Sequence, residues 1–431
     1  MTPPPPSPDE SERVFWLRAR VFALTWVTYA SYYLGRKGLS VVKTRLVMTQ
    51  GIDESALALI DSAFLVAYAL GLPASGMLGD RVGARRLLSA GLLVSAGACA
   101  SFGLASAVGP FLLAFLLNGF AQSTGWPGTN KAMADWTPPA SRGRVMGIWA
   151  TCYQVGGVVA TALASYLLTH RGWRAVFVVP ALWLALLAAV VALSLPGAPA
   201  RGEGAAAGPA RPGVPRAPAE AAPAGDERRA ARRALVRSPR VWSYGASYFC
   251  IKLIRYGILF WLPYYLFRVL GYPEGSAGYY STSFEIGGVA GAIAFGVLSD
   301  RFPALSRPAW AALGLAGLAL ALGLYQALAA RGPAFNFGLM ALVGFLLFGP
   351  DALLSGAAAQ ELGGRHAAGT AVGLVNGVGS AGAVLQGFLL VGVSRRFGWP
   401  AVFYAFLACA LLGALALAPS LRARRGRAAE A

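Results

Sequence analysis

The hexapeptide GMLGDR at residues 76–81 recurs as GVLSDR at residues 296–301. A second pair, GWRAVF at 172–177 and GWPAVF at 398–403, is separated by nearly the same offset. Because the two motifs recur at nearly the same distance along the chain, the two halves of the chain are predicted to be copies of one ancestral unit.

The composition excludes several classes of protein. Of the 431 residues, 56% are hydrophobic and only 13% are charged, yet the net charge is +19. Soluble domains average about 25% charged residues, so the excess of basic residues indicates neither a nucleic-acid binder nor a disordered chain. The four cysteines lack the spacing of metal sites or disulfide frameworks, and we expect no metal or cofactor.

Long apolar runs alternate with short polar segments along the chain, as in proteins with many transmembrane helices. They predict an all-α polytopic membrane protein with twelve transmembrane helices in two pseudo-symmetric six-helix bundles, the architecture of the major facilitator fold. The expected spans are 15–45, 54–79, 87–107, 109–134, 143–168, 173–196, 241–269, 277–300, 308–330, 334–358, 367–394 and 399–420.

The spans divide the chain into five parts: a disordered tail 1–14, a first bundle 15–196, an Ala/Pro/Arg-rich linker 197–240, a second bundle 241–420 and a basic tail 421–431. Most of the 37 Lys and Arg residues fall in segments that are cytoplasmic if both termini are inside. The N-terminus lacks the features of a signal peptide. We therefore expect a multi-pass protein of the inner (plasma) membrane with both termini in the cytoplasm, and a monomer.

We single out eight of the charged residues in the expected spans, because insertion of such a residue at mid-bilayer costs about 2.5–3.5 kcal/mol. This cost predicts a polar cavity inside the helices or, for some of the residues, snorkelling to the interface. The eight are Arg36, Lys37, Lys131, Lys252, Arg255, Asp61, Glu285 and Asp351.

The two arginines are the strongest cavity candidates. Arg255 has long apolar flanks on both sides, from which snorkelling is difficult. Arg36 and Lys37 would snorkel if the first span ended before them, but residues 21–34 form only about 21 Å of helix, too short for a core of about 30 Å. The helix must continue past Arg36, which occupies the same place in its repeat as Arg255.

Each of the other charged residues has two interpretations. Lys252 lies one turn before Arg255 and either lines the cavity or repels that arginine into a particular rotamer. Lys131 is a cavity residue or an interfacial lysine. The acids Asp61, Glu285 and Asp351 are substrate contacts or, as we favour, counter-ions of the lysines in pairs that rearrange during transport.

The five cations exceed the three acids by two, which favours an anionic substrate. A phosphate monoester carries a charge of about −1.5 to −2 at pH 7, and arginine can hold two of its oxygens at once. One arginine from each half would clamp a phosphate from both sides. Because an empty site would leave two arginines facing each other, we expect exchange against inorganic phosphate. Tyr33, Tyr153 and Tyr256 are candidate contacts for hydroxyl groups of the substrate, or ordinary packing residues.

The repeated motif lies between the second and third spans of each half. In the first half it reads GMLGDRVGARR (76–86) and includes Asp80, Arg81 and Arg85; in the second it includes Asp300 and Arg301. We interpret these residues as a conformational latch outside the substrate site.

Several segments together resemble the organophosphate:phosphate antiporters of the major facilitator superfamily. YYLGRKGLSVVKTRL (32–46) resembles the first-span arginine motif, and LIRYGILFWLPYYL (253–266) the seventh span of glycerol-3-phosphate and hexose-phosphate transporters. Further matches are IDSAFLVAYALG (60–71), GFAQSTGWPGTNKAMADW (119–136), RGRVMGIW (142–149), FEIGGVAGAIAFGVLSDR (284–301) and GFLLFGPDALLSGAAAQELG (344–363).

The resemblance implies phosphate coordination by Arg36 and Arg255, and rearranging salt bridges at Lys37 and Glu285. The chain departs from glycerol-phosphate transporters in three places. Tyr153, followed by Gln154, replaces a histidine; Phe260 replaces an acid; and Leu72 replaces a lysine. The resemblance thus implies an antiporter of an organic phosphate, glycerol-3-phosphate or a sugar phosphate such as glucose-6-phosphate.

Two other functions remain open. A proton-coupled organic-anion transporter would use Asp61, Glu285 or Asp351 as its proton carrier. A transporter-like sensor would bind a sugar phosphate without moving it. No nucleophile–base pair or nucleotide-binding loop is apparent, so we do not expect an enzyme.

Overall fold

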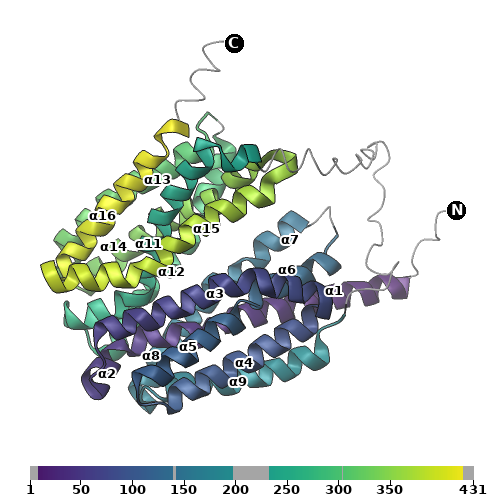
Figure 1. Ribbon diagram of the computed structural model, residues 1–431, viewed down its shortest axis with the longest axis horizontal. Helices are drawn as coiled ribbons and strands as arrows, with labels where there is room; N and C mark the ends of the chain where they lie inside the picture. Colours follow the sequence, from purple (N-terminus) through teal and green to yellow (C-terminus); the bar gives the residue numbers. More distant parts are fainter. Residues whose placement is uncertain (1–7, 139–141, 198–232, 303, 421–431) are drawn as a thin grey trace, which may run out of the picture. The chain divides into compact units, whose positions relative to one another are not determined.

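A computed structural model of the chain describes residues 8–138, 142–197, 233–302 and 304–420. The predicted tail 421–431, most of the predicted linker and the first seven residues lie outside the described residues. The described parts are almost entirely helical, as predicted (Figure 1). The first helix already begins at Pro8, so residues 8–14 of the predicted tail are helical.

The first half of the chain contains nine helices within the described ranges. They are α1 (Pro8–Tyr32), α2 (Leu34–Gln50), α3 (Glu54–Val82), α4 (Ala84–Leu104), α5 (Val108–Gln122), α6 (Gly125–Trp136), α7 (Arg142–Trp149), α8 (Thr151–Arg171) and α9 (Ala175–Ser194).

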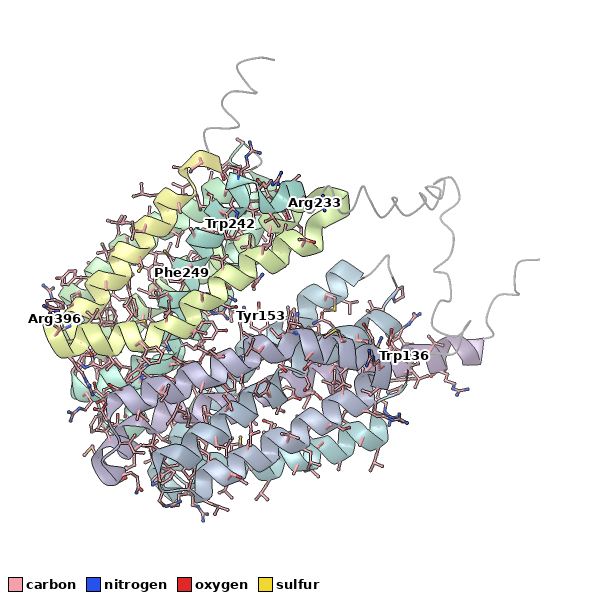
Figure 2. The ribbon with its side chains drawn as sticks, viewed as in Figure 1. Trp136, Tyr153, Arg233, Trp242, Phe249 and Arg396 are labelled. Carbon is pink, nitrogen blue, oxygen red and sulfur yellow. The ribbon has the colours of Figure 1, made fainter. Side chains whose placement is uncertain are left out.

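The described residues of the second half begin with a short helical segment, 233–236, at the end of the predicted linker. Trp242, labelled in Figure 2, donates its indole N–H to the carbonyl of Val236, 2.8 Å away, so this segment contacts the helix that follows it. The longer helices are α11 (Pro239–Arg268), α12 (Glu274–Arg301), α13 (Arg307–Leu328), α14 (Pro333–Ala352), α15 (Ala358–Phe397) and α16 (Trp399–Ala416).

Ten helical stretches among the described residues are long and apolar enough to cross a membrane. The two remaining predicted spans, 15–45 and 109–134, are each divided into two helices. The first divides at Tyr33, and the second at Ser123 and Thr124, whose hydroxyls bond back to the carbonyls of Phe120 and Ala121. Such bonds compete with the helical pattern. The prediction of twelve spans therefore agrees with ten helical stretches plus two broken ones.

The chain forms two compact units. Unit 1 contains residues 1–45 and 63–214, and unit 2 contains residues 46–62 and 215–431. The units follow the predicted bundles except for residues 46–62, which belong to the first half of the sequence but pack with the second. In unit 2, Ser62 donates to the carbonyl of Val384 on α15 at 2.8 Å, and Ala58 lies against Gly387.

Small residues bring the helices of unit 2 into close contact. A Cβ atom on Gly287 or Gly291 of α12 would lie about 2 Å from a carbonyl oxygen of α14, and one on Gly344 of α14 equally close to a carbonyl of α12. Close approach through glycine is typical of membrane helices. The tight contact between α12 and α14 fixes the position of α14 relative to α12. α14 carries part of the candidate site.

Candidate functional site

Arg36 of unit 1 lies on α2, just after the break at Tyr33, and is 8% exposed. Its Nε donates to Oε1 of Gln122 on α5 at 3.0 Å. The guanidinium carbon also lies about 5 Å from the ring centres of Tyr33, Phe64 and Tyr68. The prediction that the first span buries this arginine is confirmed.

Further hydrogen bonds hold Gln122, the hydrogen-bond partner of Arg36, in place. Gln122 donates to the side-chain oxygen of Asn118 at 3.1 Å, and Ser95 donates to the same oxygen at 2.7 Å. The amide nitrogen of Asn118 then donates to the backbone carbonyl of Gly35 at 2.8 Å. Because this chain of hydrogen bonds returns to the residue before Arg36, it sets the orientation of the Gln122 amide. The sequence reasoning missed Gln122 and Asn118, although both are polar residues within an expected span.

Two lysines follow Arg36 on α2. Lys37 is 3% exposed, so its side chain is buried and does not reach the surface. Lys43 is fully buried and was missed, although it lies in the expected span 15–45. The count of five cations and three acids, from which we predicted an excess of two positive charges, therefore omitted one buried lysine.

The polar residues that replace the family's histidine lie on α8 of unit 1. Tyr153 is half-buried and packs on the same hydrophobic cluster that contains Tyr29, Tyr33 and Trp149 (Figure 2). Gln154 is buried. The structure thus brings Tyr153 and Tyr33 into one cluster.

Arg255 of unit 2 lies on α11, with 16% of its side chain exposed. Its Nη1 donates to Oδ2 of Asp351 on α14 at 2.8 Å. The ring of Phe348, also on α14, lies 4.4 Å from the guanidinium carbon, and that of Tyr256 lies 5.9 Å away. Asp351 is therefore a counter-ion of the arginine, and our expectation that it would pair with a lysine was wrong.

The two arginines occupy equivalent environments within their own units. Arg36, from the first expected span, contacts the fourth span of its half through Gln122, and Arg255, from the seventh, contacts the tenth through Asp351. The internal duplication visible in the sequence thus extends to these contacts.

Lys252 lies one turn before Arg255 and extends to a different helix. Its ammonium donates to the hydroxyl of Ser380 on α15 at 3.2 Å and lies 5.0 Å from the ring centre of Tyr248. The remaining predicted acids, Asp61 on α3 and Glu285 on α12, are both buried.

The residues of the repeated motif lie at helix ends. Asp80 pairs with Lys131 at 3.3 Å in unit 1, so this lysine is joined to the latch motif, in line with the interfacial interpretation. Asp300 pairs with Arg307 at 3.0 Å in unit 2, and Arg307 also contacts Glu361 at 2.7 Å. Arg307 was missed, although it opens the helix that follows the motif. The other predicted latch residues, Arg81, Arg85 and Arg301, are exposed.

Among the described residues, no group of three or more His, Cys, Asp or Glu side chains is arranged to hold a metal ion. Each unit thus holds one largely buried arginine with a hydrogen-bond partner and aromatic rings around it. Such an arrangement can bind and release an oxyanion.

Comparison with known proteins places the chain among transporters. The sequence profile of the Major Facilitator Superfamily matches residues 25–387. A glucose-6-phosphate exchanger of Bos taurus is 30% identical over 462 aligned residues, which cover 93% of both chains. A putative glycerol-3-phosphate transporter of Arabidopsis thaliana is 31% identical and covers 93% of this chain and 86% of its own.

A probable hexose phosphate transport protein of Chlamydia pneumoniae is 28% identical over 95% of this chain and 92% of its own. The fold is similar to that of a bacterial homologue of the human lysosomal transporter Spinster, solved in an inward-facing, unoccupied conformation. That structure matches with a TM-score of 0.73 and 20% identity, over 94% of this chain and 96% of its own. The chain belongs to the Major Facilitator Superfamily and, within it, to the organophosphate:phosphate antiporter family.

Proposed function

We propose that this protein exchanges an organic phosphate, glycerol-3-phosphate or a sugar phosphate such as glucose-6-phosphate, for inorganic phosphate. The observation that carries the proposal is a largely buried arginine at the equivalent position of each unit, hydrogen-bonded to the fourth span of its own half. The named activities of the relatives point to the same class of substrate.

In this mechanism each arginine binds the phosphate from its own unit. Guanidinium groups match the oxygens of phosphate in pairs. When the two bundles rock between alternating orientations, each keeps its arginine and the anion is released to one side. A return step with inorganic phosphate bound keeps both arginines neutralised, which favours exchange over one-way transport.

Polar residues near the arginines would recognise the organic part of the substrate. We assign this secondary role to Tyr33, Tyr153, Gln154 and Tyr256, with Lys37 and Lys252 adding positive charge. Lys131 joins the latch, because its ammonium lies 3.3 Å from a carboxylate oxygen of Asp80. The gating residues of the proposal are Asp61, Glu285, Asp80, Arg81, Arg85, Asp300 and Arg301, together with Arg307.

The excess of basic residues in alternate loops supports an orientation with both termini in the cytoplasm of a cell whose plasma membrane holds the protein. We propose that it works as a monomer, because each unit supplies its own arginine and the substrate needs one from each.

Exchange in proteoliposomes tests the function. Wild-type protein should exchange internal labelled phosphate for external phosphate, glycerol-3-phosphate or glucose-6-phosphate, and competition among these and phosphoglycerates ranks the substrates. Arg36→Ala and Arg255→Ala should each lower exchange by about 100-fold or more, because loss of a hydrogen-bonded charge pair costs several kcal/mol. Arg331→Ala, at an exposed position of a connecting turn, serves as the control. Near-normal exchange by either arginine variant would contradict the clamp.

The three buried acids support a second candidate, proton-coupled uptake of an organic anion. Uptake driven by a pH gradient into liposomes without internal phosphate would favour this candidate. Ligand binding without any flux would instead indicate a sensor.

A further inference from the structure

The contact between Arg255 and Asp351 joins two charged groups in the interior of unit 2. Asp351 has 11% of its side chain exposed and lies 2.8 Å from the guanidinium. Phe348 lies one turn before Asp351 on α14, so the same helix face presents a ring and a carboxylate to one arginine. The guanidinium carbon lies over this ring, 4.4 Å from its centre, while Nη1 donates to the carboxylate.

The edge that Asp351 occupies is the part of an arginine that binds phosphate. Carboxylates and phosphates accept the same in-plane N–H groups, often with two oxygens at once. A carboxylate fixed to α14 and a phosphate arriving from solution therefore need the same donor. Both cannot use the Nη1 of Arg255 in the same way.

The ion pair is also only half formed. Oδ2 of Asp351 accepts the hydrogen bond, whereas Oδ1 is buried and has no hydrogen-bond partner among the described residues. A buried acceptor without a donor costs free energy. The helix is also irregular beyond Asp351, because residues 353–357 form a π-helical turn, a feature that is frequent at functional sites.

We propose that Asp351 is a tethered competitor of the substrate phosphate for Arg255, and thereby a specificity-determining residue. The inference rests on the proposed function and names a residue that tunes it. In the absence of substrate, the carboxylate occupies the Nη1 donor of the arginine. A phosphate must displace it, which a dianion does far more readily than a monocarboxylate.

Because a substrate must displace Asp351 from Arg255, the site discriminates against anions with a single negative charge. A monocarboxylate gains one ion pair with Arg255 only by breaking the equivalent pair with Asp351. A phosphate dianion brings a second charge and further acceptor oxygens, so its gain exceeds the loss. Selectivity obtained by an opposing interaction inside the site is a general form of molecular discrimination.

Kinetics of the Asp351→Asn variant in proteoliposomes test the competition. The KM for inorganic phosphate should fall by about tenfold, the equivalent of one ion pair worth about 1.4 kcal/mol. Acetate, added as a competitor, should inhibit this variant at concentrations about tenfold lower than those that affect the wild type. Asp351→Glu, which keeps the charge, should retain the wild-type response to acetate.

Asp135→Asn is the matched control, because it removes a carboxylate from unit 1 without touching the arginines. A purely structural role for Asp351 would lower the amount of folded protein and kcat but would leave the KM and the acetate response unchanged. An unchanged or higher KM in an active Asp351→Asn variant overturns the proposal, even while the wild type exchanges phosphate. If the wild type itself moves no phosphate, the proposed function fails instead.

A measurement on wild-type protein covers the case in which Asp351→Asn does not fold. Infrared difference spectra recorded with and without inorganic phosphate should show a change in the carboxylate stretching bands, since Asp351 leaves the guanidinium when phosphate binds. Asp351→Glu should shift the position of this change. Spectra of phosphate-binding wild-type protein without any carboxylate change overturn the proposal.

Discussion

Aromatic rings lie around the arginine of each unit. Tyr33, Phe64 and Tyr68 lie about 5 Å from Arg36, and Phe348 lies 4.4 Å from Arg255. A cation over such a ring gains about 0.5–2 kcal/mol. These ring contacts stabilise each arginine in addition to its hydrogen bond with Gln122 or Asp351.

The Gln122 amide is the residue-scale feature on which the position of Arg36 depends. Gln122→Met keeps the length of the side chain but removes the acceptor 3.0 Å from Nε. Because a hydrogen bond to a charged group is worth about 1.5–3 kcal/mol, we expect kcat/KM for phosphate exchange to fall by about 10- to 100-fold. Exchange kinetics in proteoliposomes measure this loss.

Ser165→Ala is the control for that variant, since Ser165 is a fully buried polar residue of the same unit on α8. Its hydroxyl donates to the carbonyl of Thr161, one turn earlier on the same helix. It should leave kcat/KM within about twofold, because loss of a local hydroxyl contact is worth at most about 1 kcal/mol. Equal losses in both variants would show that Gln122 acts on general packing.

The sequence predicted which arginines are buried but not what holds them. Arg36 and Arg255 could be identified because the length of a membrane span leaves no alternative position for them. Their partners lie 86 and 96 residues away along the chain. Such partners depend on how helices pack, and the reasoning therefore paired Asp351 with lysines and overlooked Gln122.

At the scale of the element, the hydropathy pattern of the sequence did not predict where a helix is interrupted. The run 109–134 is continuously apolar enough to predict one span, yet α5 ends at Gln122 and α6 begins at Gly125. The break depends on two hydroxyls that bond back to the preceding turn. Hydropathy averages over such local competition, so it predicts that a span exists but not that it is divided.

Because α12 and α14 lie so close together, we expect a single added methyl group between them to lower the stability of the protein. In Gly291→Ala the new Cβ would lie 2.0 Å from the carbonyl oxygen of Phe345, so the two helices must separate. Overpacking of this kind costs about 1–3 kcal/mol. We expect a clear fall in the unfolding temperature in detergent, and a lower exchange rate because α14 carries Phe348 and Asp351.

Gly296→Ala provides the control on the same helix, because a Cβ there meets no atom within 4 Å. Alanine is a better helix former than glycine by about 1 kcal/mol. The unfolding temperature of this variant should therefore stay the same or rise. If Gly291→Ala behaved in the same way, the close α12–α14 contact would be contradicted.

The loop before α3 carries a pH-dependent attachment to unit 2. Burial tends to raise the pKa of Asp53, but hydrogen bonds from Ser55 and the guanidinium of Arg395 outweigh it, and the pKa lies below its ordinary value. A carboxyl whose pKa is lowered by folding stabilises the folded state above its unfolded pKa of about 3.9. That stabilisation is lost as the pH falls through the lower, folded value.

Hydrogen exchange checks this attachment. After correction for intrinsic rates, exchange in residues 46–62 should increase as the pH falls below the ordinary carboxyl value of about 3.9 and through the lower pKa of Asp53 in the folded state. Asp53→Asn should show the increased exchange already at pH 5. Asp135→Asn, which alters a carboxylate of unit 1, should follow the wild type. Protection of 46–62 that did not change with pH in the wild type would contradict the role of Asp53.

At the scale of the whole molecule, the duplication determined most of the organisation. The repeated motifs and the linker predicted two bundles, and the units agree with them apart from residues 46–62. That exception rests on tertiary contacts, such as Ser62 with Val384 and Glu54 with Tyr264. α3 therefore begins in unit 2 and ends in unit 1, which no pattern within a single repeat could indicate.

The expected orientation predicts which connecting segments face outward. With both termini in the cytoplasm, the loop between α4 and α5 lies outside and the loop between α12 and α13 lies inside. Ala107 and Leu305 are exposed residues of these two loops. Each can be replaced by cysteine in a variant without Cys99, Cys152, Cys250 and Cys409, all of which are free thiols.

A membrane-impermeant maleimide should label Ala107→Cys in intact cells. It should label Leu305→Cys only in inverted vesicles, because the reagent cannot cross the bilayer to a cytoplasmic loop. Labelling of both residues after detergent treatment confirms that each is reachable. The reverse pattern would contradict the orientation derived from the basic residues, while the exchange assay, which depends on Arg36 and Arg255, would be unaffected. The charge distribution of the loops and the charges inside the helices are thus tested separately.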